Sequence, residues 1–286
     1  MWTLPFRTAL AALSLCAGLA GQGDAQQMGR TSGNLLDDAR RIITSDKGDV
    51  RLWAHPPRVV VITTDPFVRD ELGRIRQAIE AVVPPITGDS FFGRWEFIKP
   101  HAGFAGGHAP LGMRLVKGGP AGSEIALNLG HGQLFRADIV IASADRATIA
   151  VLNGLWGLSA ANTRRQMEGG RTHCFHSVYS REGVRRGAYV SMVTPRDQRE
   201  ISDCLWEDLL QTLGPLETLT DTPFFSFDHK ILSTEVQRRN DLLLLRALYE
   251  SDAGPGGSPS VVIRYLDKLR RADGEDAGEN GDRRQP

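Results

Sequence analysis

The sequence predicts a single mixed α+β domain in which a small twisted sheet packs on helices. Two observations support this fold class. Short runs of β-branched residues, such as residues 58–64 (RVVVITT), alternate with segments whose apolar residues recur at helical spacing. The chain has 286 residues, which is long enough for one large domain with a substantial core even after a leader is removed. We expect this globular domain to span residues 51–271.

Residues 1–25 have the features of a cleavable Sec signal peptide. The first seven residues carry one positive charge and no acid, and residues 8–20 form a short apolar run. That run is shorter than the roughly 20 apolar residues of a membrane span. Small residues allow cleavage after Ala20 or after Ala25. The sequence therefore predicts a bacterial protein that is periplasmic or secreted.

The first half of the mature chain begins with an N-terminal arm over residues 26–50, which is polar apart from a helix-like patch at Leu35–Ile43. Residues 58–64 are typical of a buried strand. Val68–Val83 has its apolar residues at the spacing of an amphipathic helix, and Pro84 and Pro85 end it. Two short strands are expected at residues 94–98 and 113–116, around a loop at residues 101–112 that contains Gly and His.

The second half also alternates strands and helices. Ala137–Ala142 (ADIVIA) is typical of a buried strand, and a helix is expected over Ala147–Trp156. His173–Ser180 and Arg186–Thr194 are expected to form two strands joined by a turn at Gly183. Further along we expect helices at residues 241–250 and 261–271, a linker at 253–259 between them, and a disordered, polar C-terminal tail at 272–286.

A motif helix at about residues 195–214 has the clearest boundary signals. Thr194 is the expected N-cap, Pro195 the expected first helical residue, and Gly214 with Pro215 ends the helix. The expected apolar face consists of Ile201, Leu205, Leu209 and Leu213.

Charge and hydropathy exclude two classes of partner. Lys and Arg number 34, as do Asp and Glu, and the arginine pairs are scattered along the chain. Nothing here indicates a nucleic-acid partner. No segment after the leader reaches membrane-spanning length without charges, so we expect no membrane span. The expected partners are periplasmic or envelope peptides or proteins.

The cysteines predict one disulfide. Cys16 lies in the apolar run of the leader; because Leu15 precedes it, we interpret it as a leader residue and keep lipidation as the alternative. Cys174 and Cys204 then remain, an even number in a compartment where disulfides persist. We expect them to pair, with two buried free thiols as the alternative.

The motif helix invites comparison with the zinc-protease pattern H-E-x-x-H-x-x-G. In that pattern two histidines bind Zn²⁺ and the glutamate activates water. The same offsets hold Glu207, Asp208 and Gln211 in this chain, and Gly214 occupies the place of the motif glycine. The third ligand position of the longer pattern holds Glu217.

The segment Cys204–Gly214 also resembles a known family, the secreted bacterial domain of unknown function 2927. That family shows an E-E-x-x-Q-x-L-G helix here, and the preceding Gly187–Val190 and the later Asp241–Tyr249 are similar as well. The resemblance covers roughly residues 51–251 and is specific only after Cys174. It implies a remote, degenerate relative of the zincin metalloproteases, with a mixed α and β fold and an active-site-like helix. It implies no established activity.

The side chains at the metal-ligand positions of the motif differ from those of zinc proteases. Gln211 and Glu207 replace the two imidazoles, and an amide oxygen is a weak ligand for Zn²⁺, so we expect no resident cofactor. One alternative is a weak site for a hard cation such as Ca²⁺ or Mn²⁺ at Glu207, Gln211 and Glu217. Another is metal-free acid–base chemistry by Glu207 with Asp208 or Glu217. A third is a polar network with a structural role only.

Histidine and aromatic residues give weaker evidence for a functional site than the motif helix does. His173 and His176 would point to opposite faces of a strand, which makes a shared ligand site awkward. Trp206, together with Trp156 and residues 224–227 (FFSF), could line a cleft near the motif helix, but core packing is the simpler use.

Three functional hypotheses follow. The first is a non-catalytic module that binds a peptide or envelope partner through Trp206, Gln211 and Glu217. The second is an atypical peptidase-like hydrolase in which Glu207 and Asp208 are catalytic and a metal is weakly held. The third is a structural module of the cell envelope.

Overall fold

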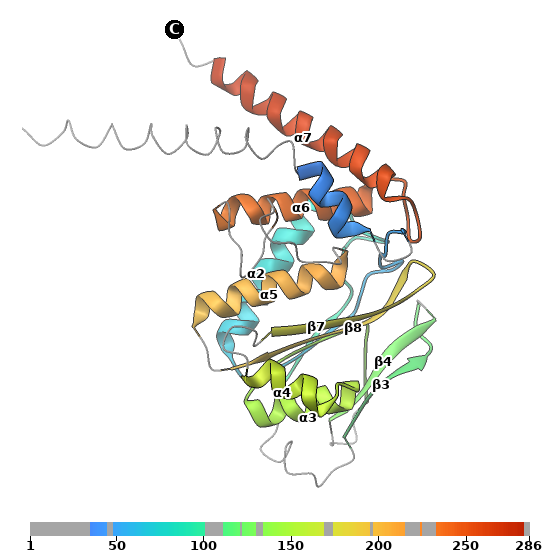
Figure 1. Cartoon of the computed structure of the whole chain (residues 1–286), viewed down its shortest axis with the longest axis vertical. Coiled ribbons are helices and arrows are strands. Elements are labelled where there is room, and N and C mark those ends of the chain that lie inside the picture. The colour runs from blue at the N-terminus through green and yellow to red at the C-terminus, as the bar shows by residue number, and fades with distance from the viewer. Residues whose placement is uncertain are drawn as a thin grey trace, which may run out of the picture.

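The computed structural model describes residues 35–44, 48–100, 111–120, 122–129, 134–168, 174–194, 197–214, 224 and 233–282 (Figure 1). It is a mixed α+β fold in which a sheet packs against helices, as the sequence predicts. None of the helices in these ranges is long and apolar enough to cross a membrane.

The central sheet has five strands in the order β2-β1-β6-β8-β7. Strands β1, β2, β6 and β8 are mutually parallel, and β7 pairs antiparallel with β8 at one end of the sheet. The central strand β6 and its neighbour β1 are buried at every position, as expected for a parallel sheet covered on both faces. The bounds are β1 Val59–Thr63, β2 Trp95–Ile98, β6 Ile139–Ala144, β7 Cys174–Arg181 and β8 Val184–Val193.

Side chains alternate between two hydrophobic clusters, one on each face of this sheet. Val59 and Val61 belong to the first cluster, whereas Val60 and Ile62 belong to the second. Helices pack against the first face: a helix over residues 35–43, α2 Pro66–Val82, α5 Gln198–Leu213, α6 Thr234–Glu250 and α7 Pro259–Asp282. The second face carries α3 Arg146–Trp156, α4 Ala160–Glu168 and a three-stranded antiparallel sheet of β3 Leu111–Lys117, β4 Ser123–Leu129 and β5 Leu134–Ala137.

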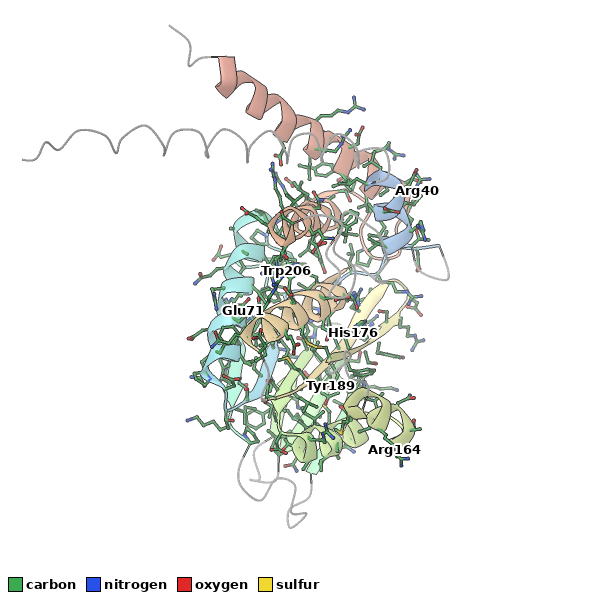
Figure 2. All side chains as sticks on the ribbon, turned by 60° about the vertical axis from the view of Figure 1, so that its left-hand side comes forward. Arg40, Glu71, Arg164, His176, Tyr189 and Trp206 are labelled. Atoms are coloured by element: carbon green, nitrogen blue, oxygen red, sulfur yellow. A yellow bond between two sulfur atoms is a disulfide. The ribbon has the colours of Figure 1, made fainter. Side chains whose placement is uncertain are left out.

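Figure 2 shows the two helical layers on either side of the sheet. Glu71 on α2 and Trp206 on α5 lie in one layer, and Arg164 on α4 lies in the other. The sheet therefore separates the motif helix α5 from the α3 and α4 pair.

Several predicted elements are confirmed within a few residues, but three expectations need correction. The N-cap of α5 is Asp197, whose carboxylate accepts from the Arg199 N–H; Thr194 instead donates its N–H to Ala144 and prolongs the pairing of β8. Helix α6 begins at Thr234, capped by Ser233, rather than near residue 241. Helix α7 runs from Pro259 to Asp282, past residue 271, where the sequence predicts that this helix ends.

Candidate functional site

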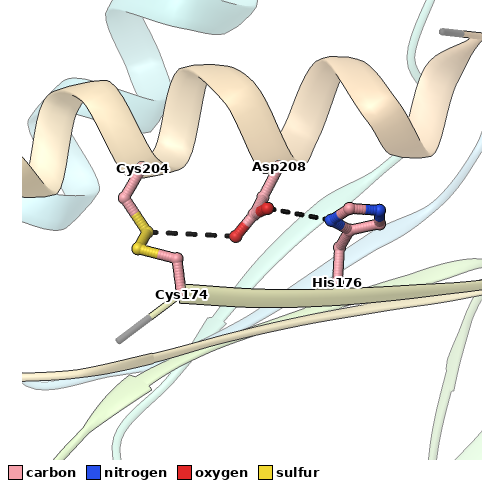
Figure 3. Close-up of a disulfide and its surroundings, with 4 residues drawn as sticks. All are labelled: Cys174, His176, Cys204 and Asp208. Carbon is pink, nitrogen blue, oxygen red and sulfur yellow. Dashed lines mark hydrogen bonds and ion pairs between the residues drawn. A yellow bond between two sulfur atoms is a disulfide. The ribbon is translucent and has the colours of Figure 1, made fainter. Parts of the chain in front are cut away.

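A disulfide joins the start of β7 to the motif helix. Cys174 and Cys204 are bonded, with 6.0 Å between their Cα atoms (Figure 3). The predicted pairing is therefore confirmed. It fixes the strand against the first two turns of α5, so the residues that follow each cysteine are also brought together.

The next contact along this pair of elements is between His176 and Asp208. Figure 3 shows that strand and helix run in the same direction from the disulfide to this pair. Two residues along a strand advance the chain by roughly 6.6 Å, and four residues along a helix by about 6 Å. The two advances match, so His176 meets Asp208, and the distance from Nδ1 to Oδ1 is 2.9 Å.

This pair consists of a buried carboxylate and a partly exposed imidazole. The Asp208 side chain is 9% exposed and that of His176 is 31% exposed. A carboxylate only accepts hydrogen bonds, so the ring donates from Nδ1 and the neutral imidazole keeps Nε2 as an acceptor. The other carboxylate oxygen lies 3.9 Å from the Cys204 sulfur, which has no proton to donate in the disulfide. Asp208 thus orients His176.

Glu207 and Gln211 lie on the neighbouring side of α5. The Gln211 amide donates to a Glu207 carboxylate oxygen over 3.4 Å, and Gln211 is buried. This contact agrees with the third alternative given above, in which these side chains form a polar network with a structural role only. Glu217, the third expected member of the set, lies outside the described residues, as does His173.

Trp206 lies on a different side of the helix. It is buried, its indole N–H donates to Asp241 on α6 over 2.8 Å, and the Arg238 guanidinium lies 4.8 Å from its ring centre. The structure therefore places Trp206 in the packing between α5 and α6.

Potential metal ligands converge at one place within the described ranges. Ligand atoms of Cys174, Cys204 and Asp208 all lie within 4.8 Å of one another. Both sulfur atoms are used in the disulfide, so neither is a thiolate that could hold a metal. In the oxidised protein this group is a structural junction.

Three side chains from other parts of the chain lie at the C-terminal end of α5. The Trp53 indole donates to the carbonyl of Thr212, the Tyr249 hydroxyl to that of Leu213, and the Arg185 guanidinium to that of Gly214. Carbonyls at a helix end lack partners within the helix, and the helix dipole is negative there. A cation and two neutral donors therefore fix the end of the motif helix.

A family model covers much of this region. Residues 132–268 match the family described as Protein of unknown function (DUF2927). The DUF2927 match includes both members of the disulfide, the His176–Asp208 pair and all of α5. Strands β1 and β2 and helix α2 precede it. Comparison with curated proteins and with solved structures gave no match.

Sequence reasoning missed two residues of this region. His176 carried a signal, because Cys174 and His176 are two apart on a strand and share a face. Combined with the disulfide and the helical spacing of Cys204 and Asp208, that signal predicts the pair only where strand and helix run in the same direction. Arg185 carried a weaker signal. Arg185 and Arg186 are consecutive residues of one strand, so their side chains face opposite sides of the sheet and one of them must point toward the protein interior.

Proposed function

We propose that this chain is an exported, non-catalytic module that binds an extended peptide of an envelope partner along the outer edge of β7, beside His176. The observation that carries the proposal is the position of β7 at the end of the sheet order. Among the described residues no strand pairs with its outer edge. A free strand edge presents N–H and C=O groups to which an extended peptide can add as a further strand.

The chemistry of α5 supports binding without catalysis. A degenerate zincin-like motif would place Glu207 and Gln211 where imidazole ligands are needed, and Asp208 where a glutamate activates water. Asp208 is instead buried between the disulfide and His176 and holds the imidazole. The exposed face of His176 supplies a hydrogen-bonding group next to the strand edge.

One observation favours a second candidate, an atypical peptidase-like hydrolase. An imidazole oriented by a buried carboxylate is the arrangement of a general base. In this alternative His176 acts as the base, with Glu207 nearby and a metal weakly held. The alternative predicts turnover, whereas the binding module predicts none.

Selection from a random peptide library on the mature protein tests the proposal. We expect enriched peptides to slow amide hydrogen exchange in β7 and to remain uncleaved. His176→Ala should weaken their binding about tenfold, which corresponds to loss of one hydrogen bond. Arg164→Ala is the matched control, because this exposed residue lies on α4 beyond the sheet (Figure 2).

Other outcomes of this selection would contradict the binding module. Cleavage of selected peptides that is abolished in His176→Ala would replace the binding module by the hydrolase. Failure to enrich any peptide, or protection that spares β7, would overturn the proposal and leave the structural envelope module.

A further inference from the structure

A small cavity opens at the other end of the central sheet, where β1 and β2 begin beside β5. Its volume is about 330 Å³, within the range of small-molecule sites. Three of its lining residues are arginines, and one is an acid. The lining consists of Arg58, Val59, Val60, Arg94, Glu96, Leu134, Phe135 and Arg136.

Arg58 is fixed in place beneath this cavity. Its backbone N–H and Nε donate to one oxygen of Asp138 over 2.8 and 2.9 Å, and Nη2 donates to the other over 3.1 Å. Nη2 also donates to Glu124 over 2.8 Å. Asp138 is completely buried and Glu124 nearly so, hence the planar guanidinium is held in one orientation before any ligand arrives. Such preorganisation lowers the entropic cost of binding.

The other two guanidinium groups are closer to solvent. Arg136 donates to the second oxygen of Glu124 over 2.9 Å and is 42% exposed, and Arg94 donates to Glu96 over 2.7 Å and is 75% exposed. A guanidinium has five N–H donors, so these contacts leave donors on both side chains for a ligand. Both carboxylates that pair with these arginines from inside are buried: Glu124 contacts Arg58 and Arg136, and Asp138 contacts Arg58.

We propose that this cavity binds a small anion that carries phosphate or several carboxylate groups. Guanidinium forks match such groups with paired, charge-assisted hydrogen bonds. A cation would meet three arginines, and a neutral apolar ligand would leave their donors without partners. Leu134, which is 52% exposed, offers an apolar contact for the carbon part of the ligand.

The anion site is independent of the proposed peptide edge. Strand β2 and strand β7 lie at opposite ends of the sheet order. The arginine cavity also draws on residues that precede the DUF2927 match, namely Arg58, Arg94 and Glu96. Either activity can therefore be lost while the other is kept.

Calorimetric titration of the mature protein with pyrophosphate and with citrate, at constant ionic strength, tests the site. We expect saturable binding of at least one probe, and Arg94→Gln and Arg136→Gln should each raise its Kd about tenfold, as for loss of one charge-assisted hydrogen bond. The Arg94 side chain is largely exposed, so the Arg94→Gln variant should fold normally and decides the case. Arg271→Gln is the control, because Arg271 is 70% exposed and paired with Asp267 on α7.

The choice of probe distinguishes the ligand chemistry. Preference for pyrophosphate assigns a phosphate ligand, and preference for citrate assigns a carboxylate ligand. No saturable binding of either probe to the wild type would overturn the proposal. An equal increase in Kd for the Arg271→Gln variant would also overturn the proposal, because the effect would then reflect general surface charge and not this cavity.

Discussion

At the residue scale, Arg185 shows how one buried cation organises the end of the motif helix. Its side chain is fully buried, and in the described part of the chain it donates to the carbonyls of Arg51 and Gly214. Burial lowers its pKa to about 10. The last turn of α5 has no basic residue of its own. Arg185 therefore supplies, from β8, the positive charge that favours a helix C-terminus.

Tyr249 belongs to the same arrangement and gives a pH-dependent prediction. Burial raises its pKa above the ordinary value of 10.0. The folded state therefore keeps the phenol proton longer than the unfolded state, and this contribution to stability is complete below pH 10.0 and lost as the pH rises further. Buried Tyr189 behaves in the same way, and the lowered pKa of Arg185 acts in the opposite direction.

We expect Tyr249→Phe to lower the free energy of unfolding by about 1–2 kcal/mol at neutral pH, because it removes the hydrogen bonds with Leu213 and Trp53. Above pH 10.0 the variant should lose stability less steeply than the wild type. Urea unfolding of the variant and the wild type, at neutral pH and above pH 10.0, measures both differences. Tyr179→Phe is the control, since Tyr179 is exposed. Parallel pH curves for Tyr249→Phe and wild type would contradict the assignment.

At the element scale, the sequence predicts those segments whose pattern is local. The sequence predicts strand β1, helix α2 and strand β6 to within a few residues, because β-branched runs and helical spacing indicate buried elements directly. Strands β4 and β5 were missed, since β5 is only four residues long and lies beside Gly-rich segments. The start of α6 was missed because its first turns lack a continuous apolar pattern, although Ser233 is a good cap.

The candidate site was predicted only in part, because only some of its features depend on local patterns in the sequence. The helix and the disulfide follow from caps, spacing and compartment, which are local or compositional signals. The His176–Asp208 contact depends on strand and helix running in the same direction, which is a property of the sheet topology. The cluster of Arg58, Glu124 and Asp138 likewise joins residues from three segments that are far apart in the sequence or in different strands and connections.

The disulfide itself yields an element-scale prediction. It closes a loop with a sequence separation of 30 residues, for which the chain-entropy model gives about 3 to 4 kcal/mol. We expect the double variant Cys174→Ser with Cys204→Ser to lose that stability in urea unfolding. Reduced wild type should match the variant. If oxidised wild type and variant unfold at the same urea concentration, the disulfide does not stabilise the junction of β7 and α5.

At the scale of the whole molecule, the region matched by DUF2927 is not a complete core. Strand β1 lies between β2 and β6 in the sheet, yet β1 and β2 precede the match. Without them, β6, which is buried along its whole length, becomes an open edge, and α5 and α6 lose their contacts with α2. The bonds from Arg58 to Asp138 also cross this boundary. The fold therefore needs both parts of the chain.

This argument predicts how fragments behave. A fragment of residues 132–268 should aggregate or lack a cooperative unfolding transition, because an open apolar strand edge carries unpaired N–H and C=O groups. A fragment of residues 35–282 contains every strand of both sheets and the core helix at residues 35–43, and should unfold cooperatively. Size-exclusion chromatography and urea unfolding followed by circular dichroism distinguish the two. Addition of residues 48–131 in trans should rescue the short fragment, since that segment carries β1, α2 and β2. A monomeric, cooperatively unfolding 132–268 fragment would show instead that β6 is stable as an edge and that the first strands are an accessory to the domain.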